Sequence, residues 1–242
     1  TLFTLGDSEE LWEGTPSEVV EYNKEGLKKE AEFLNKDRFY KLYGNHDLEW
    51  KFLVPQTMYL KPIFGQKLKI SEGILLKTRF SGEEFEILLS HGHQGDRKSD
   101  GNAFSMWFVA AIWTPIQRFL ELSIDVISDS FELVDKHNIM MYQWSATKKN
   151  LIFISGHTHK PVFASLDHID RLEKELDYFR KNNMQEKANE IEEELKKRKK
   201  EYEGKQIVRT MVVPSYFNTG CCSFNDGDIT GIEISNGYIM LI

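Results

Sequence analysis

Four short polar segments of this sequence carry residue types that bind metal ions in proteins. They are Gly6-Asp7, Gly44-Asn45-His46-Asp47, His91-Gly92-His93 and Gly156-His157-Thr158-His159. Their candidate metal ligands are one carboxylate, one amide oxygen and three imidazoles: Asp7, Asn45, His91, His157 and His159. This mixture suits borderline divalent ions such as Mn, Fe(II), Co or Zn, and it lacks the thiolates of a closed structural zinc site.

Two such ions held close together could support hydrolysis at phosphorus. Metal ions about 3.5–4 Å apart can hold an attacking hydroxide and neutralise a phosphoryl group during in-line displacement. The carboxylate of Asp7 has two oxygens and can bridge two ions, while His157 and His159 can bind neighbouring ions from one tight loop. The alternative is that the four segments are unrelated polar loops.

Each segment follows an apolar run, which predicts that its polar residues stand at the end of a strand. The predicted strands cover residues 1–5, 38–43, 85–89 and 151–154. We expect Gly44 to allow a sharp turn after the second strand, because glycine tolerates positive φ. Functional residues gather at the carboxyl ends of strands in α/β sheets, and Asp7 and Asn45 follow two such ends.

The stretch between the first two strands carries a helix start. In Thr15-Pro16-Ser17-Glu18, the threonine can cap, the proline suits the first helical position, and the glutamate can complete a capping box. We expect one helix from there to about Asn35.

Two further regions are predicted to be helical. Residues 103–145 begin with an aromatic stretch that includes Trp107 and Trp113, and they form either a core helix or a cap that presents an apolar groove. Residues 167–204 are highly charged, which favours an inserted helical hairpin turning at Asn182-Asn183 over one long helix. That hairpin is either a solvated arm or an element for dimerisation or partner binding.

The remaining pattern is that of strands and turns. Residues 74–80 are predicted to pair with 85–89, and 229–234 with 238–242 through the strong turn signal Asn236-Gly237. Further strands are predicted at 162–164 and 207–213, with a turn at 216–220.

Composition narrows the functional classes. The chain has 242 residues and a net charge of −7, which argues against nucleic-acid binding through a basic surface. Its two cysteines, Cys221 and Cys222, are adjacent and exclude a disulfide framework, which favours a reducing compartment. No apolar run is long enough to cross a bilayer. We therefore expect a cytoplasmic location, or a peripheral one at the inner membrane face.

The four segments, in this order, resemble the motifs of the calcineurin-like metallophosphoesterase family. Glu10 and the turn Asn218-Thr219-Gly220 add to the similarity, which spans nearly the whole chain. The resemblance implies an α/β fold, a four-layer α/β/β/α sandwich, built as a single domain over residues 1–242. Residues 103–145 would be a helical cap region in this domain, and 167–204 an inserted helical hairpin.

The resemblance also implies roles for the matching residues. Asp7 would bridge two divalent ions, His159 would serve the first ion, and Asn45, His91 and His157 would complete the second site. His46 would act as the acid or electrostatic group near the leaving oxygen, oriented by a carboxylate, and we select His46 and Asp47 as catalytic residues. His93 is expected outside the inner ligand set, and His137 and His168 are expected to be structural or surface residues.

Two features depart from the family pattern. The family's first motif, Asp-x-His, does not precede Asp7; because the sequence begins with Thr1 rather than Met, we expect this motif upstream. A one-metal or metal-free relative is the alternative. Gly-Asp-x-x-Glu-Leu-Trp and the aromatic segment look most like the bacterial UDP-2,3-diacylglucosamine diphosphatase branch, but His46 stands where that branch commonly has Arg.

We therefore expect a hydrolase of phosphomonoesters, phosphodiesters or pyrophosphates that uses a metal-bridging hydroxide and two ions of Mn, Fe, Zn or Co. The resemblance implies a phosphorylated small-molecule or lipid-linked substrate, similar to a UDP-sugar lipid. The alternatives are a non-catalytic scaffold, with the hairpin as its partner surface or homodimer interface, and a nuclease of the same chemistry.

Overall fold

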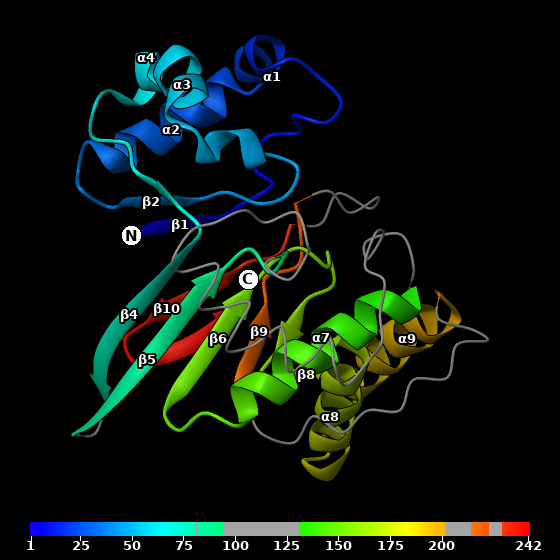
Figure 1. Ribbon diagram of the computed structural model, residues 1–242. Helices are drawn as coiled ribbons and strands as arrows, with labels where there is room; N and C mark the ends of the chain where they lie inside the picture. The colour runs from blue at the N-terminus through cyan, green and yellow to red at the C-terminus, as the bar shows by residue number, and fades with distance from the viewer. Residues whose placement is uncertain (81, 94–130, 202–213, 223–228) are drawn as a thin grey trace. The chain divides into compact units, whose positions relative to one another are not determined.

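The computed structural model shows a mixed α/β protein and describes residues 1–80, 82–93, 131–201, 214–222 and 229–242 (Figure 1). The chain divides into two compact units, each described by itself. Unit 1 comprises Thr1–Thr78, Glu86–Asp125 and Ser155–His157; unit 2 comprises Arg79–Phe85, Val126–Ile154 and Thr158–Ile242. Within the described residues, no helix has the length and apolar character needed to cross a membrane.

A small parallel sheet organises unit 1. Its strands β1 (Leu2–Leu5), β2 (Phe39–Leu42) and β3 (Ile70–Ser71) lie in that order. The register places Leu5 of β1 opposite Leu42 of β2. Because the strands are parallel and in step, the residues that follow each of them emerge at the same sheet edge. The predicted strands at 1–5 and 38–43 are confirmed.

Helices cover one side of this sheet (Figure 1). They are α1 (Pro16–Tyr22), α2 (Lys24–Leu34), the 3₁₀ turn η1 (Leu48–Lys51), α3 (Leu53–Pro55), the π turn η2 (Gln56–Leu60) and α4 (Lys61–Phe64). The core between helices and strands is formed by Leu11, Leu27, Ala31, Leu34, Phe39, Tyr43, Trp50, Leu60, Phe64 and Leu68. Positions 27, 31 and 34 share one face of α2, as helical periodicity requires.

The predicted helix start is confirmed, but the single long helix is wrong. The Thr15 hydroxyl accepts from the Glu18 backbone N–H, and the Glu18 carboxylate accepts from that of Thr15. At Asn23 the backbone leaves the helical region (φ −89°, ψ 6°), and its side chain donates to the Val19 carbonyl at 2.9 Å. A side chain that competes for a helical carbonyl in this way separates α1 from α2.

The larger sheet has six strands in the order β4-β5-β6-β9-β7-β8. These are β4 (Gly73–Phe80), β5 (Glu83–Ser90), β6 (Leu151–Ser155), β7 (Val162–Phe163), β8 (Leu166–Asp167) and β9 (Tyr216–Asn218). The predicted pairing of 74–80 with 85–89 is confirmed. The turn predicted at 216–220 is wrong at its start, because Tyr216–Asn218 is a buried strand in which Asn218 pairs with Val162 of β7.

A separate two-stranded ribbon ends the chain. Strands β10 (Ile232–Ser235) and β11 (Tyr238–Leu241) pair antiparallel, with Ser235 opposite Tyr238. Asn236 and Gly237 both have positive φ, 52° and 82°, which is the geometry of the tight turn predicted there.

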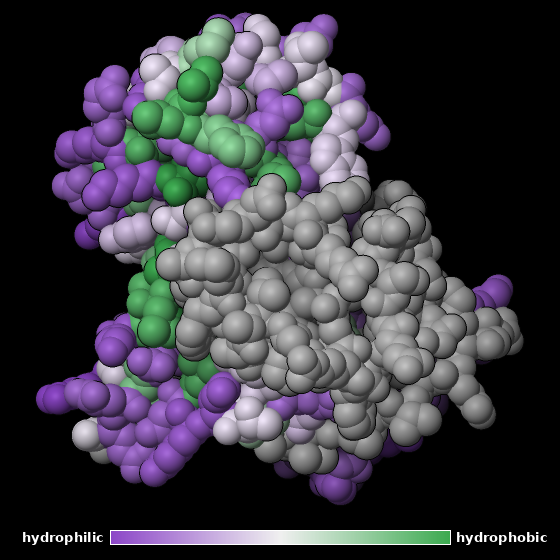
Figure 2. All heavy atoms as spheres, in the orientation of Figure 1, coloured by the Kyte–Doolittle hydropathy of each residue, from purple (hydrophilic) through white to green (hydrophobic). Residues whose placement is uncertain are grey.

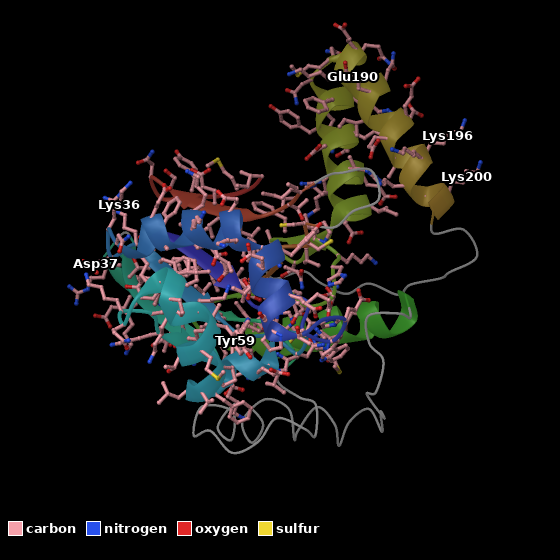
Figure 3. The ribbon with its side chains drawn as sticks, turned by 90° about the horizontal axis from the view of Figure 1, so that it is seen from above. Lys36, Asp37, Tyr59, Glu190, Lys196 and Lys200 are labelled. Carbon is pink, nitrogen blue, oxygen red and sulfur yellow. The ribbon has the colours of Figure 1, made fainter. Side chains whose placement is uncertain are left out.

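Unit 2 also contains the predicted helical hairpin. Helix α7 (Phe131–Ala146) precedes it, and α8 (His168–Lys181) and α9 (Gln185–Glu201) form its arms. Ion pairs from Glu173 to Lys199 and from Arg180 to Glu192 show that the arms are antiparallel. Their apolar stripes pack on each other through Leu172, Leu176, Ala188 and Leu195. Figure 3 shows Lys196 and Lys200 pointing outward from α9.

Some predictions fall on residues that the structure does not describe. They are the aromatic part of the 103–145 region, up to residue 130, and the strand at 207–213. The described remainder of the first region is helix α7, in agreement with the helical prediction.

Candidate metal centre

The loops after β1 and β2 pass very close to each other in unit 1. Gly6 has φ +89°, and a Cβ built on it would lie 2.5 Å from the backbone nitrogen of Gly44. A Cβ on Gly44 would overlap the carboxylate of Asp7. The sharp-turn explanation for Gly44 was wrong, since its φ is not among the positive ones. Glycine is needed at position 44 because the Asp7 side chain occupies the space of a Cβ.

Three of the predicted ligands converge in unit 1. One ligand atom each from Asp7, His91 and His157 lie within 4.8 Å of one another. Asp7 follows β1, His91 follows β5, and His157 follows β6. Asn45, which follows β2, joins them through its amide oxygen, 3.1 Å from Nε2 of His91. Four segments far apart in sequence thus deliver two imidazoles, a carboxylate and an amide oxygen to one place.

Both nitrogens of the His91 ring face oxygen atoms. Its Nδ1 lies 2.8 Å from the carbonyl oxygen of Leu5, which can only accept, so Nδ1 carries a proton. Its Nε2 faces two further oxygens, Asp7 Oδ2 at 2.9 Å and Asn45 Oδ1 at 3.1 Å. In the neutral ring Nε2 offers only a lone pair, so a positive charge is required between these atoms, either a proton or a cation. Metal-binding histidines are commonly fixed by such a bond from the other ring nitrogen.

Electrostatics within the cluster favour the charged forms. Burial opposes ionisation of Asp7, but His91 and the backbone N–H of His46 hold the pKa of this carboxyl at about 2. Burial likewise disfavours a charged His91, yet the neighbouring Asp7 raises the pKa of its imidazole. The centre is therefore anionic at Asp7 and stabilises positive charge next to it.

Two of the clustered residues have strained backbones. Asp7 has φ +52° and His157 has φ +70°, values that cost non-glycine residues free energy. Such strain persists only where surrounding contacts enforce it, and it is concentrated at functional sites. Here the backbone of Gly92, with φ +112°, comes so close that a Cβ built on it would lie 3.3 Å from the Cβ of His157. In addition, the Gly156 N–H donates to the His91 carbonyl.

His46 lies beside the cluster but has different neighbours. Its backbone N–H donates to Asp7 Oδ1 at 2.8 Å, so the loop after β2 binds the side chain of the loop after β1. Its ring Nδ1 lies 2.5 Å from Glu10 Oε2, and the ring stacks on Trp12 with centroids 4.0 Å apart and planes 21° apart. The carboxylate that orients His46 is therefore that of Glu10.

Asp47, predicted as catalytic, contacts backbone groups. Its fully buried carboxylate accepts from the N–H of Gly44 at 2.5 Å and from that of Ser8 at 3.1 Å, which ties the two loops together. Burial and the charge of Glu9 raise its pKa to about 6, against the opposing effect of Lys41. These contacts give Asp47 a positioning role, and a direct part in catalysis stays a prediction.

A buried ion pair joins the loop after β1 to strand β2 and helix α2. Lys41 on β2, fully buried, binds Glu9 at 2.9 Å and Glu30 of α2 at 3.4 Å. The other oxygen of Glu9 accepts from the indole N–H of Trp50 at 2.9 Å. Burial disfavours the ammonium, but the surrounding carboxylates raise the pKa of Lys41, so the cation persists.

The other predicted histidines are placed as follows. His93 is buried in unit 1, with its ring 5.2 Å from that of His91 and 6.1 Å from that of Tyr43, which fits a supporting position. His159 is exposed, has φ +55° and belongs to unit 2, so its role as a ligand stays a prediction. His137 is buried in α7, and His168 begins α8.

Sequence reasoning assigned no role to three residues of this region. Trp12 and Glu9 lie in the first loop, and Lys41 lies inside a strand. A lysine within the apolar run Phe39-Tyr40-Lys41-Leu42 was a usable signal, because a charge on a buried strand requires a buried partner. Neither models of known protein families, nor curated proteins, nor solved structures gave a match to this chain.

Proposed function

We propose that this protein is a metal-dependent phosphoesterase with the four-layer sandwich of the calcineurin-like metallophosphoesterases. The support is the order of the four motifs together with the mixed α/β fold and the convergence of their side chains in unit 1. The predicted substrates are phosphomonoesters, phosphodiesters or pyrophosphates, including UDP-sugar-lipid-like compounds.

The environment of His91 Nε2 is the observation that carries the proposal. An oxygen of the Asp7 carboxylate and the Asn45 amide oxygen lie 2.9 Å and 3.1 Å from this nitrogen, while the carbonyl oxygen of Leu5 fixes the opposite ring nitrogen. With His157, they offer the nitrogen and oxygen ligands that Mn, Fe(II), Co or Zn accept. A second ion, held with His159, is a further part of the proposal.

The chain's own residues would divide the remaining work. A bound divalent ion would supply Lewis-acid charge and lower the pKa of water. His46 would donate a proton to the leaving oxygen through Nε2, because Nδ1 is occupied by Glu10. Glu10 would orient the imidazole through Nδ1, and the Trp12 ring would hold it from one face.

Hydrolysis of a chromogenic phosphodiester and the matching monoester with Mn²⁺ tests this function. We expect His46→Ala to lower turnover by about 10²- to 10⁴-fold, the usual contribution of a positioned acid, with Mn²⁺ binding retained. Asp7→Asn should instead weaken Mn²⁺ binding itself. Tyr22→Ala, which removes an aromatic side chain that is 91% exposed on α1, is the control and should leave both unchanged.

An active His46→Ala variant would refute the assigned acid. Absence of hydrolysis with both esters, combined with absence of Mn²⁺ binding, would refute the proposed function and favour the scaffold alternative. Tight Mn²⁺ binding without hydrolysis would refute only these substrates.

A further inference from the structure

We propose that Trp12 is a stacking platform for a flat, unsaturated ring of the substrate, so that the site takes phosphate compounds of the nucleotide class. This inference rests on the proposed function, because it assumes that the phosphate binds at the Asp7 cluster. Trp12 would then select compounds by the group that is attached to their phosphate.

The indole is held rigidly next to the candidate centre. The Trp12 backbone N–H donates to Glu10 Oε1 at 3.1 Å, and the other oxygen of Glu10 binds His46. The neighbouring Leu11 N–H donates to the His46 carbonyl at 3.1 Å, and Leu11 itself is part of the buried core. The segment that leads to the indole is thus fixed to the loop after β2.

The indole has one covered face and a large free surface. Its ring stacks on the imidazole of His46, yet 67% of the Trp12 surface remains exposed. An imidazole is smaller than an indole, so a stack with His46 covers one indole face only in part. With its ring centroid 4.0 Å from that of His46, the indole lies directly against the group proposed to protonate the leaving oxygen.

Exposure alone does not single out Trp12. Apolar and hydrophilic side chains intermix on the face of unit 1 in Figure 2, and Phe52, Leu53, Val54 and Met58 are also exposed in this unit. Trp12 differs from them because it is fixed by a ring stack and lies against His46. A rigid aromatic side chain loses little conformational entropy on binding, which makes it an effective contact surface.

The chemistry of an open indole face favours flat rings. Stacking on aromatic side chains tolerates every nucleobase, because each base has a π face, and it strengthens binding by about 5- to 150-fold per base. Phosphate at the metal centre and a base on Trp12 would together bind the two ends of a nucleotide. The acidic net charge of −7 excludes only the basic surface that long nucleic acids need.

Binding of two matched ligands tests the platform. Adenosine 5′-monophosphate and ribose 5-phosphate share phosphate and sugar, and only the first carries a base. Their dissociation constants are measured with the Mn²⁺-loaded protein by intrinsic tryptophan fluorescence, read within seconds of mixing, and by calorimetry. We expect the nucleotide to bind about 5- to 150-fold more tightly, with the same ratio in Tyr22→Ala.

Trp12→Ala should bring that ratio close to one while ribose 5-phosphate keeps its affinity, and Trp12→Phe should restore part of the ratio. Far-UV circular dichroism and Mn²⁺ affinity confirm that each variant is folded. An unchanged ratio in Trp12→Ala, an equal affinity of the parent for both ligands, or no binding of either ligand would overturn the proposal. Ester hydrolysis, measured separately, distinguishes these results from a failure of the proposed function.

Discussion

Replacing Lys41 by methionine should destabilise unit 1 by an amount that becomes smaller as the pH falls. Methionine retains the buried apolar stem of Lys41 and removes its charge. Glu9, which is 2% exposed, then loses the cation 2.9 Å away and keeps only the indole N–H of Trp50. A buried carboxylate without a cation either stays ionised, which destabilises the folded state, or takes up a proton.

The proton route gives the cost at Glu9, the more buried of the two carboxylates that Lys41 binds. Protonating an ordinary glutamate, of pKa about 4.3, requires about 3.7 kcal/mol at pH 7 and about 1 kcal/mol at pH 5. The value at pH 7 lies within the roughly 3–5 kcal/mol typical of breaking a buried ion pair. A chain of this length has an unfolding entropy of about 0.5 kcal/mol per kelvin, so the melting temperature should fall by about 7 °C at pH 7 and about 2 °C at pH 5. If unit 1 unfolds by itself, its smaller entropy makes both shifts larger.

Urea and thermal unfolding at both pH values provide the assay. The double variant Lys41→Met/Glu9→Gln should recover most of the loss at pH 7, because glutamine still accepts from Trp50 and carries no charge. Lys67→Met is the control, since Lys67 and its partner Asp37 are largely exposed and such pairs contribute at most about 1 kcal/mol. A deficit that is equal at pH 5 and pH 7, or a double variant as unstable as the single one, would refute this account.

Two further predictions concern the loops above this ion pair. The folded pKa of Asp47 is raised to about 6 from 3.8, so the folded state binds more protons than the unfolded state between these values, and this residue should make stability fall as pH rises from about 4 to 6. Asp47→Asn should abolish that slope in denaturation curves. At pH 4 it should cost about 1–3 kcal/mol, because asparagine cannot accept from both Gly44 and Ser8, and this deficit should shrink as the pH rises to 6. A slope that survives in the variant would show that another group causes it. Gly44→Ala should displace the Asp7 carboxylate and weaken Mn²⁺ binding by about 10- to 100-fold in calorimetry, as expected when the support of a ligand is lost. Gly26→Ala in α2, with no atom within 4 Å of the added Cβ, should leave the Mn²⁺ affinity unchanged, and equal affinities in both variants would contradict the steric argument.

The sequence by itself determined the local elements of this protein. Strands β1, β2 and β6, the capping box at Thr15 and the turn at Asn236-Gly237 follow from residue types within a few positions, and all were predicted. The helical hairpin was predictable for the same reason: each arm carries an apolar stripe at helical spacing, and the two stripes pack on each other. Residue types and their place after strands also selected Asp7, His91 and His157, which unit 1 brings together.

Tertiary structure decided what depends on atoms far apart in the chain. Tyr216–Asn218 is a strand because it pairs with β7, and glycine is required at position 44 because Asp7 approaches it. The partner of His46 is Glu10 from another loop, while the adjacent Asp47 turns to backbone N–H groups. Sequence spacing cannot distinguish two carboxylates that are both compatible with an imidazole. The packing of the loops after β1 and β2 makes that choice, because it fixes which oxygen reaches which nitrogen.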